Sequence, residues 1–168
     1  GRLSYSPGQF AELKVTPDLA RFYSMSGLAE DQELRFDIRI IHGGIASRVF
    51  REELKPGASL SLRGPLGASY LRQAPRAPVV IASAGTGLGP ALAVLRGLST
   101  MHAHGPVHVY ASFMSSSDVY GLEELNERVR QIPSASGPQV VVASGPIDSS
   151  MRRGLLTEAI ESDLGRLD

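Results

Sequence analysis

The residues best suited to bind a ligand form a glycine-rich segment, Gly85-Thr86-Gly87-Leu88-Gly89-Pro90, in the middle of the chain. The segment follows an apolar run over residues 79–82 and precedes a helical pattern, which is typical of a turn from a buried strand into a helix. Glycines let the backbone approach a ligand, proline suits a first helical turn, and free N–H groups at a helix start favour phosphate. We therefore expect a nucleotide diphosphate here, with an ordinary ligand-free strand-to-helix turn as the open alternative.

Two common phosphate motifs do not match this turn. The segment is not G-x-G-x-x-G, and the strand end that would carry the acidic residue of that motif reads Tyr110-Ala111-Ser112-Phe113. A P-loop needs a lysine directly after its glycines, whereas the chain has only Lys14 and Lys55. If the turn binds a nucleotide, it does so in another way.

A second candidate site lies nearer the N-terminus. Arg21-Phe22-Tyr23-Ser24 combines a cation, a phenol and a hydroxyl, which can pair with a phosphate, pack on a ring and hydrogen-bond its edge. Arg39 follows, and Gly43-Gly44-Ile45-Ala46-Ser47 opens a predicted helix, which gives a second anion site. Taken singly, Arg21 also fits a solvated strand residue and Tyr23 a core residue.

Other chemistries lack the residues they need. The chain has no cysteine, so it holds no disulfide, thiolate zinc site or cysteine-ligated iron–sulfur cluster. No G-x-S-x-G sequence supports a hydrolase. His102, His104 and His108 are expected in a loop and a buried strand, so no metal site is predicted. With 17 basic and 17 acidic residues, the net charge is zero, which argues against nucleic acid or an anionic membrane as partner.

Up to residue 74, short alternating apolar runs predict the strands of an antiparallel sheet or small barrel. These runs cover residues 9–15, 34–40 and 59–63. One helix is expected between Gly44 and Pro56, because apolar residues recur there at helical spacing.

From residue 75 onward, continuous apolar runs alternate with helical patterns. The runs cover residues 79–82, 107–110 and 140–142, and the expected helices cover residues 90–98, 121–132 and 152–164. Buried strands that alternate with helices predict a parallel sheet covered on both faces. We therefore predict two domains, 1–74 and 75–168, with a two-domain β plus α/β fold.

One uncharged stretch, residues 77–95, is long enough to need a membrane test. Three glycines and a proline near its centre would interrupt a spanning helix. We expect a soluble, cytoplasmic protein.

Four motifs together resemble the ferredoxin–NADP reductase superfamily. Arg21 to Ser24 is similar to its R-x-Y-S flavin motif, Gly44 to Ser47 to its diphosphate-binding helix start, and Gly64-Pro65-Leu66-Gly67 to its G-P-x-G turn. Gly85 to Pro90 is similar to its G-T-G-x-x-P nucleotide motif. The order matches over essentially the whole chain, and Pro7-Gly8-Gln9-Phe10 most resembles reductase components of bacterial aromatic-ring dioxygenases, of the naphthalene dioxygenase type.

The resemblance implies a flavin-binding β-barrel followed by a nicotinamide-nucleotide domain. Arg21 would neutralise the flavin phosphate, Tyr23 would pack on the isoalloxazine ring, and Ser24 would bond near the flavin N5, with Thr86 close to both cofactors. Tyr23, Ser24 and Thr86 would thus stand nearest the reaction. The implied cofactor-binding positions are Arg21, Phe22, Tyr23, Ser24, Ile38, Arg39, Gly43, Gly44, Ile45, Ala46, Ser47, Gly85, Thr86, Gly87, Leu88, Gly89, Pro90, Ser112, Met114, Ser144 and Arg153.

Two departures from the family pattern bear on the cofactor. Met114 stands where relatives carry Arg in a G-x-R-x-x-x-D motif, and Gly145 stands where NADP-specific members have Arg. We therefore expect NADH to be preferred over NADPH, with Arg152 and Arg153, near the start of the third helix, as the cations left to reach the adenosine end. FAD is expected rather than FMN, and no iron–sulfur cluster is expected in this chain.

By resemblance, the chain would be an NAD(P)H-dependent flavin reductase that passes electrons to an iron–sulfur ferredoxin domain or oxygenase component. A flavin-binding electron-transfer subunit without turnover of its own is the alternative. The sequence starts just before Pro7 and stops at Asp168, so the family's first barrel strand and last segment are expected outside it. This chain alone is accordingly expected to turn over weakly.

Overall fold

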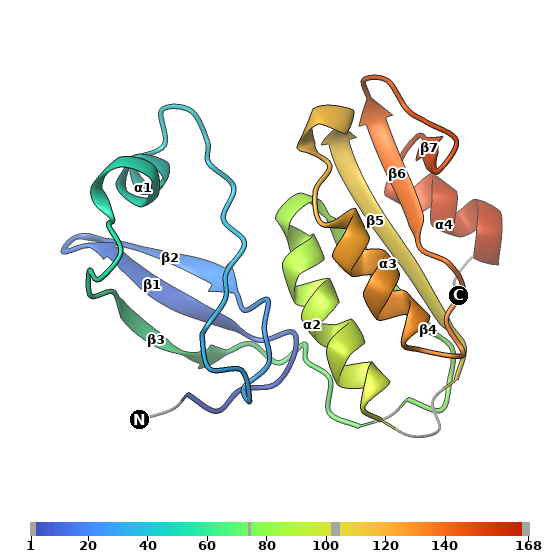
Figure 1. Cartoon of the computed structure of the whole chain (residues 1–168), viewed down its shortest axis with the longest axis horizontal. Coiled ribbons are helices and arrows are strands. Elements are labelled where there is room, and N and C mark those ends of the chain that lie inside the picture. Colours follow the sequence, from blue (N-terminus) through green and yellow to red (C-terminus); the bar gives the residue numbers. More distant parts are fainter. Residues whose placement is uncertain (1–2, 74, 102–104, 166–168) are drawn as a thin grey trace.

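The structure is a computed structural model of the 168-residue chain, and it describes residues 3–73, 75–101 and 105–165. Two sheets stand side by side, each with its own helices (Figure 1). An antiparallel sheet is built from the first part of the chain, and a parallel sheet with helices on both faces from the second. The predicted fold class is therefore confirmed.

The antiparallel sheet has three strands in the order β2-β1-β3, namely β1 (Phe10–Thr16), β2 (Leu19–Ser24) and β3 (Ser61–Leu66). Alternation sorts its side chains as predicted, since Ala11, Leu13 and Val15 of β1 are buried and Lys14 is exposed. β1 pairs with both neighbours, so one face of the central strand carries the small core of this half.

The strand predicted over residues 34–40 is wrong. This segment makes one isolated bridge, from Phe36 to Met25, and Ser26 donates its backbone N–H to the Arg35 carbonyl at 2.8 Å. Its apolar residues Leu34 and Ile40 remain exposed. Alternation indicates a strand only where a partner strand takes up the backbone groups; here the segment runs instead toward the second sheet.

The helix predicted after Gly44 is present, in two parts. α1 (Ile45–Arg48) continues into a π-helical turn, Val49–Glu53, which ends with a bond from Leu54 N–H to the Val49 carbonyl at 2.8 Å. Val49 packs inward, whereas Ile45 is exposed.

The parallel sheet has the order β4-β5-β6-β7. Its strands are β4 (Val79–Ala84), β5 (Val107–Ser115), β6 (Gln139–Ser144) and β7 (Met151–Arg153). α2 (Leu88–Ser99) and α3 (Leu122–Arg130) cover one face, and α4 (Leu156–Leu164) covers the other (Figure 1). The continuous apolar runs predicted this arrangement correctly.

One element of this half differs from the prediction. Residues 152 and 153, expected to begin the third helix, lie in β7, and α4 begins only at Leu156. β7 pairs with β6 over three residues, which is too short for periodicity to reveal. Arg152 and Arg153 are therefore strand residues at the edge of the sheet. No helix within the described part of the chain combines the length and the apolar character needed to cross a membrane.

Candidate functional site

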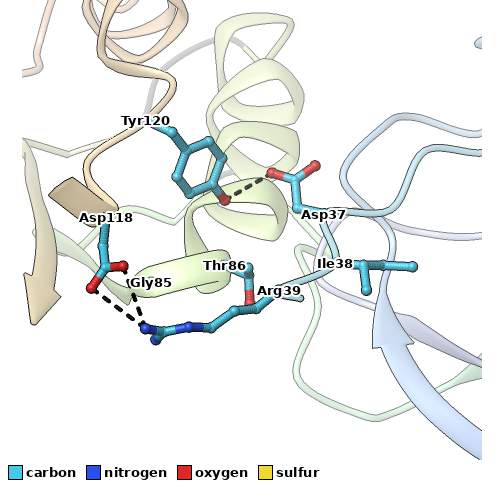
Figure 2. Close-up of a pocket in the computed structure, with 7 residues that line it drawn as sticks. All are labelled: Asp37, Ile38, Arg39, Gly85, Thr86, Asp118 and Tyr120. Atoms are coloured by element: carbon cyan, nitrogen blue, oxygen red, sulfur yellow. Dashed lines mark hydrogen bonds and ion pairs between the residues drawn. The ribbon is translucent and has the colours of Figure 1, made fainter. Parts of the chain in front are cut away.

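A cleft of about 310 Å³ lies between the two sheets (Figure 2). One wall is the segment that replaces the expected strand. The other is the glycine-rich turn, together with Asp118 at the end of the η3 turn (Ser116–Asp118) and the residue Tyr120. Its lining residues are Asp37, Ile38, Arg39, Gly85, Thr86, Asp118 and Tyr120. Ile38 and Arg39 thus face Gly85 and Thr86, although they are about fifty residues apart in the chain.

A second cavity, of about 260 Å³, continues from the same turn over the carboxyl ends of β4, β5 and β6. This is the edge of a parallel sheet where ligands bind in open α/β folds. Ser112 and Met114 line it together with Gly154 and Leu155, which precede α4. Arg39, Gly85, Thr86 and Asp118 line both cavities.

The glycines of the turn have two different functions. Gly85 has φ +53°, and a Cβ atom there would meet nothing within 4 Å, so its backbone is open to the cleft. Gly89 is buried, and a Cβ atom there would lie 2.8 Å from Asp37 Oδ2 and 2.9 Å from Ser26 Cβ. Gly85 therefore suits close approach of a ligand, whereas Gly89 allows α2 to pack on the first half.

Asp37 links the two walls of the cleft. Its carboxylate accepts hydrogen bonds from Ser26 Oγ at 3.0 Å and from Tyr120 Oη at 2.8 Å. Burial raises the pKa of Tyr120 well above its usual value, and the bond to Asp37 raises it further. The phenol therefore stays protonated and donates. The sequence motifs include neither Asp37 nor Tyr120. The signal that could have indicated Asp37 is an acidic residue within the alternating apolar run of residues 34–40.

Arg39 and Asp118 form a second link across the cleft. Arg39 Nη2 lies 3.4 Å from each carboxylate oxygen of Asp118, and both side chains are partly exposed. Figure 2 shows the guanidinium passing the glycine-rich turn to reach Asp118.

α2 touches the first half again at its other end. Arg96 donates from both Nη atoms to the two carboxylate oxygens of Asp31, at 2.7 Å each. This paired hydrogen bond lowers the pKa of Asp31 to about 2. One residue further on, a Cβ atom at Gly97 would lie 2.9 Å from Leu71 Cδ2. Both contacts fix α2 against segments of the first half.

The Arg21-Phe22-Tyr23-Ser24 strand presents its side chains to two faces. β1 pairs Tyr23 with Ala11 and Ser24 with Phe10, so Arg21 and Tyr23 share one face and Phe22 and Ser24 the other. Tyr23 packs edge-on against Phe50, with ring centroids 5.6 Å apart, and burial raises its pKa. Phe22 is 60% exposed and packs against Phe10. The motif treats all four residues as contacts of one ligand, whereas the alternation of the strand divides them between two faces.

An open hollow of about 500 Å³ lies on the Phe22 face. Its lining residues are Phe10, Phe22, Ser24, Leu66 and Gly67. On the other face, Arg21 Nη1 donates to its neighbouring Ala20 carbonyl at 2.8 Å, so the charge remains available at the surface.

The loop before α1 forms a polar hollow of about 240 Å³. Ser47 Oγ accepts the backbone N–H of Ile41 at 2.8 Å, and a Cβ atom on Gly44 would lie 3.2 Å from the Ile41 carbonyl. Gly43 is open and has φ +74°. A glycine cradle, a helix start and the nearby Arg48 and Arg51 suit an anion, so the donor set fits a diphosphate. Ser47, however, is engaged in holding the loop.

The positions expected at the adenosine end also come together. Ser112 Oγ bonds to the Ser83 carbonyl at 3.2 Å, and Ser144 Oγ to the Met114 carbonyl at 2.6 Å. Arg153 donates from Nη2 to the Gly145 carbonyl, whereas Arg152 pairs with Asp163 at 2.6 Å. Of the two arginines, Arg153 therefore stands beside Ser144 and Gly145.

His102 and His104, considered as metal ligands, lie outside the described residues, and His108 lies within β5. Among the residues that are described, no three histidine or acidic side chains are grouped to hold a metal ion.

Comparison with known proteins shows what this chain is similar to. A profile of the oxidoreductase FAD-binding domain matches residues 1–70. The chain is 40% identical over 165 residues to the ferredoxin–NAD(P)+ reductase component of naphthalene 1,2-dioxygenase/salicylate 5-hydroxylase systems from a Ralstonia species, covering 98% of this chain and 50% of that protein. It is 39% identical to the corresponding Pseudomonas putida naphthalene 1,2-dioxygenase component, covering 95% and 48%.

A solved structure agrees. The Amycolatopsis cytochrome P450 reductase superposes with a TM-score of 0.85 at 28% identity, covering 98% of this chain and 50% of that one. The chain thus spans about half the length of the curated relatives it matches. Residues 1–70 match the oxidoreductase FAD-binding domain family, and the chain as a whole is similar to the reductase components named above.

Proposed function

We propose that this chain carries the flavin and nicotinamide-nucleotide sites of an NAD(P)H-dependent reductase that passes electrons to an iron–sulfur acceptor, in a ferredoxin domain or oxygenase component of an aromatic-ring dioxygenase system. The observation that carries the proposal is the shared cleft, in which Ile38 and Arg39 of the FAD-binding half face Gly85 and Thr86 of the parallel half. A bound flavin takes up a hydride as an electron pair and releases electrons singly. The naphthalene dioxygenase reductase components named above support the acceptor class.

The domain boundary is part of the proposal. We place a flavin-binding domain at residues 1–74 and a nucleotide-binding domain at residues 75–168, with Ala74 itself outside the described residues. The separate sheets, which end at Leu66 and begin at Val79, support this division.

On the flavin side, Arg21 neutralises a phosphate and Tyr23 packs on the isoalloxazine ring. Ser24, which ends β2 and faces away from Tyr23, would reach only the edge of the ring. The Gly43–Ser47 loop donates backbone N–H groups to the diphosphate, which the polar hollow at this loop supports. Because Tyr23 already packs against Phe50, its ring has a fixed orientation for a stacked ligand. Phe22 lines the opposite face and would contact the flavin only if the ring reaches the Phe10 hollow.

On the nucleotide side, Gly85 and Gly87 provide open backbone, Thr86 faces both cavities, and Ser112, Met114 and Ser144 flank the adenosine end. Leu88 and Pro90 belong to the first turn of α2 and hold the turn in place. NADH is proposed as the preferred nucleotide, because a 2′-phosphate needs cationic partners and neither Met114 nor Gly145 supplies one. Arg153, beside Gly145, is the residue through which NADPH would bind instead.

The test is reconstitution of the 168-residue chain with FAD, followed by anaerobic addition of NADH. Retained yellow colour that bleaches with NADH supports the reductase. Colour without bleaching favours an electron-transfer subunit without turnover, and failure to bind FAD contradicts the flavin assignment. Arg21→Ala should weaken FAD binding roughly ten- to a hundredfold, because a charge-assisted contact is lost. Arg130→Ala, which removes an exposed arginine from α3, is the matched control.

A further inference from the structure

Arg39 and Asp118 stand at the boundary between the two cavities of the cleft. Each of them lines both the 310 Å³ cavity and the 260 Å³ cavity, as do Gly85 and Thr86 of the turn. The guanidinium and the carboxylate meet across the open space rather than along one wall (Figure 2). A ligand that extends from one cavity into the other must pass this ion pair.

The Arg39–Asp118 ion pair is weak enough for either side chain to take another partner. Both hydrogen bonds are long, at 3.4 Å, and the side chains are 55% and 35% exposed. Ion pairs of this kind contribute little to stability, because water and salt screen them. A phosphate, in contrast, offers arginine short and often bidentate charge-assisted bonds. Arg39 therefore has a better partner whenever a phosphate is near.

The charges around the turn make this exchange consequential. Among the described residues that line the two cavities, Arg39 is the one with a positive charge. Asp37 is held by Ser26 and Tyr120, so Asp118 is the carboxylate that competes for Arg39. Its negative charge beside the turn also repels any anion that approaches Gly85.

We propose that Asp118 competes with the pyridine nucleotide for Arg39 and thereby sets the affinity of the cleft for the nucleotide diphosphate. Without nucleotide, Arg39 is held across the cleft; with nucleotide, it turns to a diphosphate oxygen and Asp118 turns to solvent. The inference rests on the proposed function, since the diphosphate is that of the proposed nucleotide. It makes Arg39 a binding residue and Asp118 an affinity-lowering one.

The two partners of the pair should therefore act in opposite directions. NAD+ is titrated calorimetrically into the 168-residue chain and its variants. Asp118→Asn should bind NAD+ about three- to fivefold more tightly, because a competitor and a like charge are removed. Arg39→Gln should bind it about tenfold more weakly, because a charge-assisted bond is lost. In the Arg39→Gln background, the gain from Asp118→Asn should shrink, since the competition no longer exists.

Two controls isolate the effect. Glu12→Gln breaks an exposed ion pair with Arg63 that lines neither cavity, and it should leave NAD+ affinity unchanged. ADP-ribose, which keeps the diphosphate but lacks nicotinamide, should show the same gain with Asp118→Asn as NAD+ does. Thermal unfolding of each variant checks that the fold is retained.

The possible outcomes distinguish a failure of this inference from a failure of the proposed nucleotide-binding function. If the Arg39–Asp118 pair only held the two walls of the cleft together, both single variants would bind NAD+ more weakly. That result would overturn the proposed competition. Unchanged affinity of Asp118→Asn would overturn it as well. If neither the wild type nor Asp118→Asn binds NAD+ or ADP-ribose, the nucleotide site itself is refuted, and the inference falls with it.

Discussion

The two walls of the cleft are held in place by different means. In the parallel half, the glycine-rich turn connects a central helix to β4, and both are anchored in a continuous core. In the antiparallel half, the segment with Ile38 and Arg39 belongs to no sheet. Of the buried apolar side chains in the described residues, twenty lie after residue 75 and seven before it. The wall formed by the glycine-rich turn is therefore positioned by packing within its own half.

The wall formed by residues 37–39 depends on contacts with the other half. Asp37 bonds to Tyr120, Gly89 lets α2 approach Asp37 and Ser26, and Asp31 pairs with Arg96. These contacts are polar or steric rather than part of a hydrophobic core. We therefore expect substitutions in the core to unfold the parallel half. Substitutions at the contacts between the halves should displace residues 37–39 and leave both sheets intact.

Leu95→Ala should give the largest effect. Leu95 is fully buried in α2, so truncation should cost about 2–5 kcal/mol of unfolding free energy. Urea unfolding followed by circular dichroism measures this loss. Leu62→Ala in β3, where the side chain is 37% exposed, should change stability by no more than about 0.5 kcal/mol. Similar losses for the two variants would contradict the placement of Leu95 in the core and of Leu62 at the surface.

Gly89→Ala tests the steric contact between the halves. Alanine favours a helix by about 1 kcal/mol over glycine, but overpacking costs about 1–3 kcal/mol, and the clash with Asp37 should dominate. We expect a modest loss of stability and faster proteolysis of residues 26–40. Gly137→Ala adds the same methyl group where nothing lies within 4 Å, and it should leave both measurements unchanged. If the Gly89→Ala variant is more stable and its proteolysis is unaltered, Asp37 and Ser26 move aside for the added methyl group at little cost.

The Asp31–Arg96 pair should produce a smaller, pH-dependent effect. The folded-state pKa of Asp31, about 2, lies below the ordinary value of 3.8, so the unfolded chain takes up this proton first as the pH falls. The stabilisation is thus present above about pH 4 and is lost as the pH falls toward 2. Arg96→Gln should be less stable at neutral pH and should lose less between those values than the wild type.

Urea unfolding at a series of pH values measures this difference. Other carboxylates, such as Asp163, also have lowered pKa values, so the comparison between variant and wild type carries the result rather than the slope of either. Parallel slopes would show that Arg96 does not stabilise the ionised Asp31.

Local patterns sufficed for most of the parallel half. The apolar runs at residues 79–82 and 107–110 became β4 and β5, because such strands are buried on both faces and need no distant information. They failed at residues 34–40, where alternation was present but no partner strand was, and at β7, which is only three residues long.

The site was predicted in the same uneven way. Gly85, Thr86 and Arg39 were found from motifs, and the structure brings them to one cavity. Asp37 and Tyr120 were missed, because they meet across 83 residues and only the packing of the two halves joins them. Gly89 was assigned to ligand approach, whereas the structure gives it a packing role that no local pattern reveals.

The attachment of α2 at two points has a mechanical consequence. Gly89 and Gly97 are eight residues apart on one face of the helix, a separation of about 12 Å along its axis. Two anchors on a stiff helix restrict sliding and tilting of α2 against the first half. The turn at residues 85–87 leads directly into α2, so the same anchors also fix Gly85 and Thr86 opposite Ile38 and Arg39.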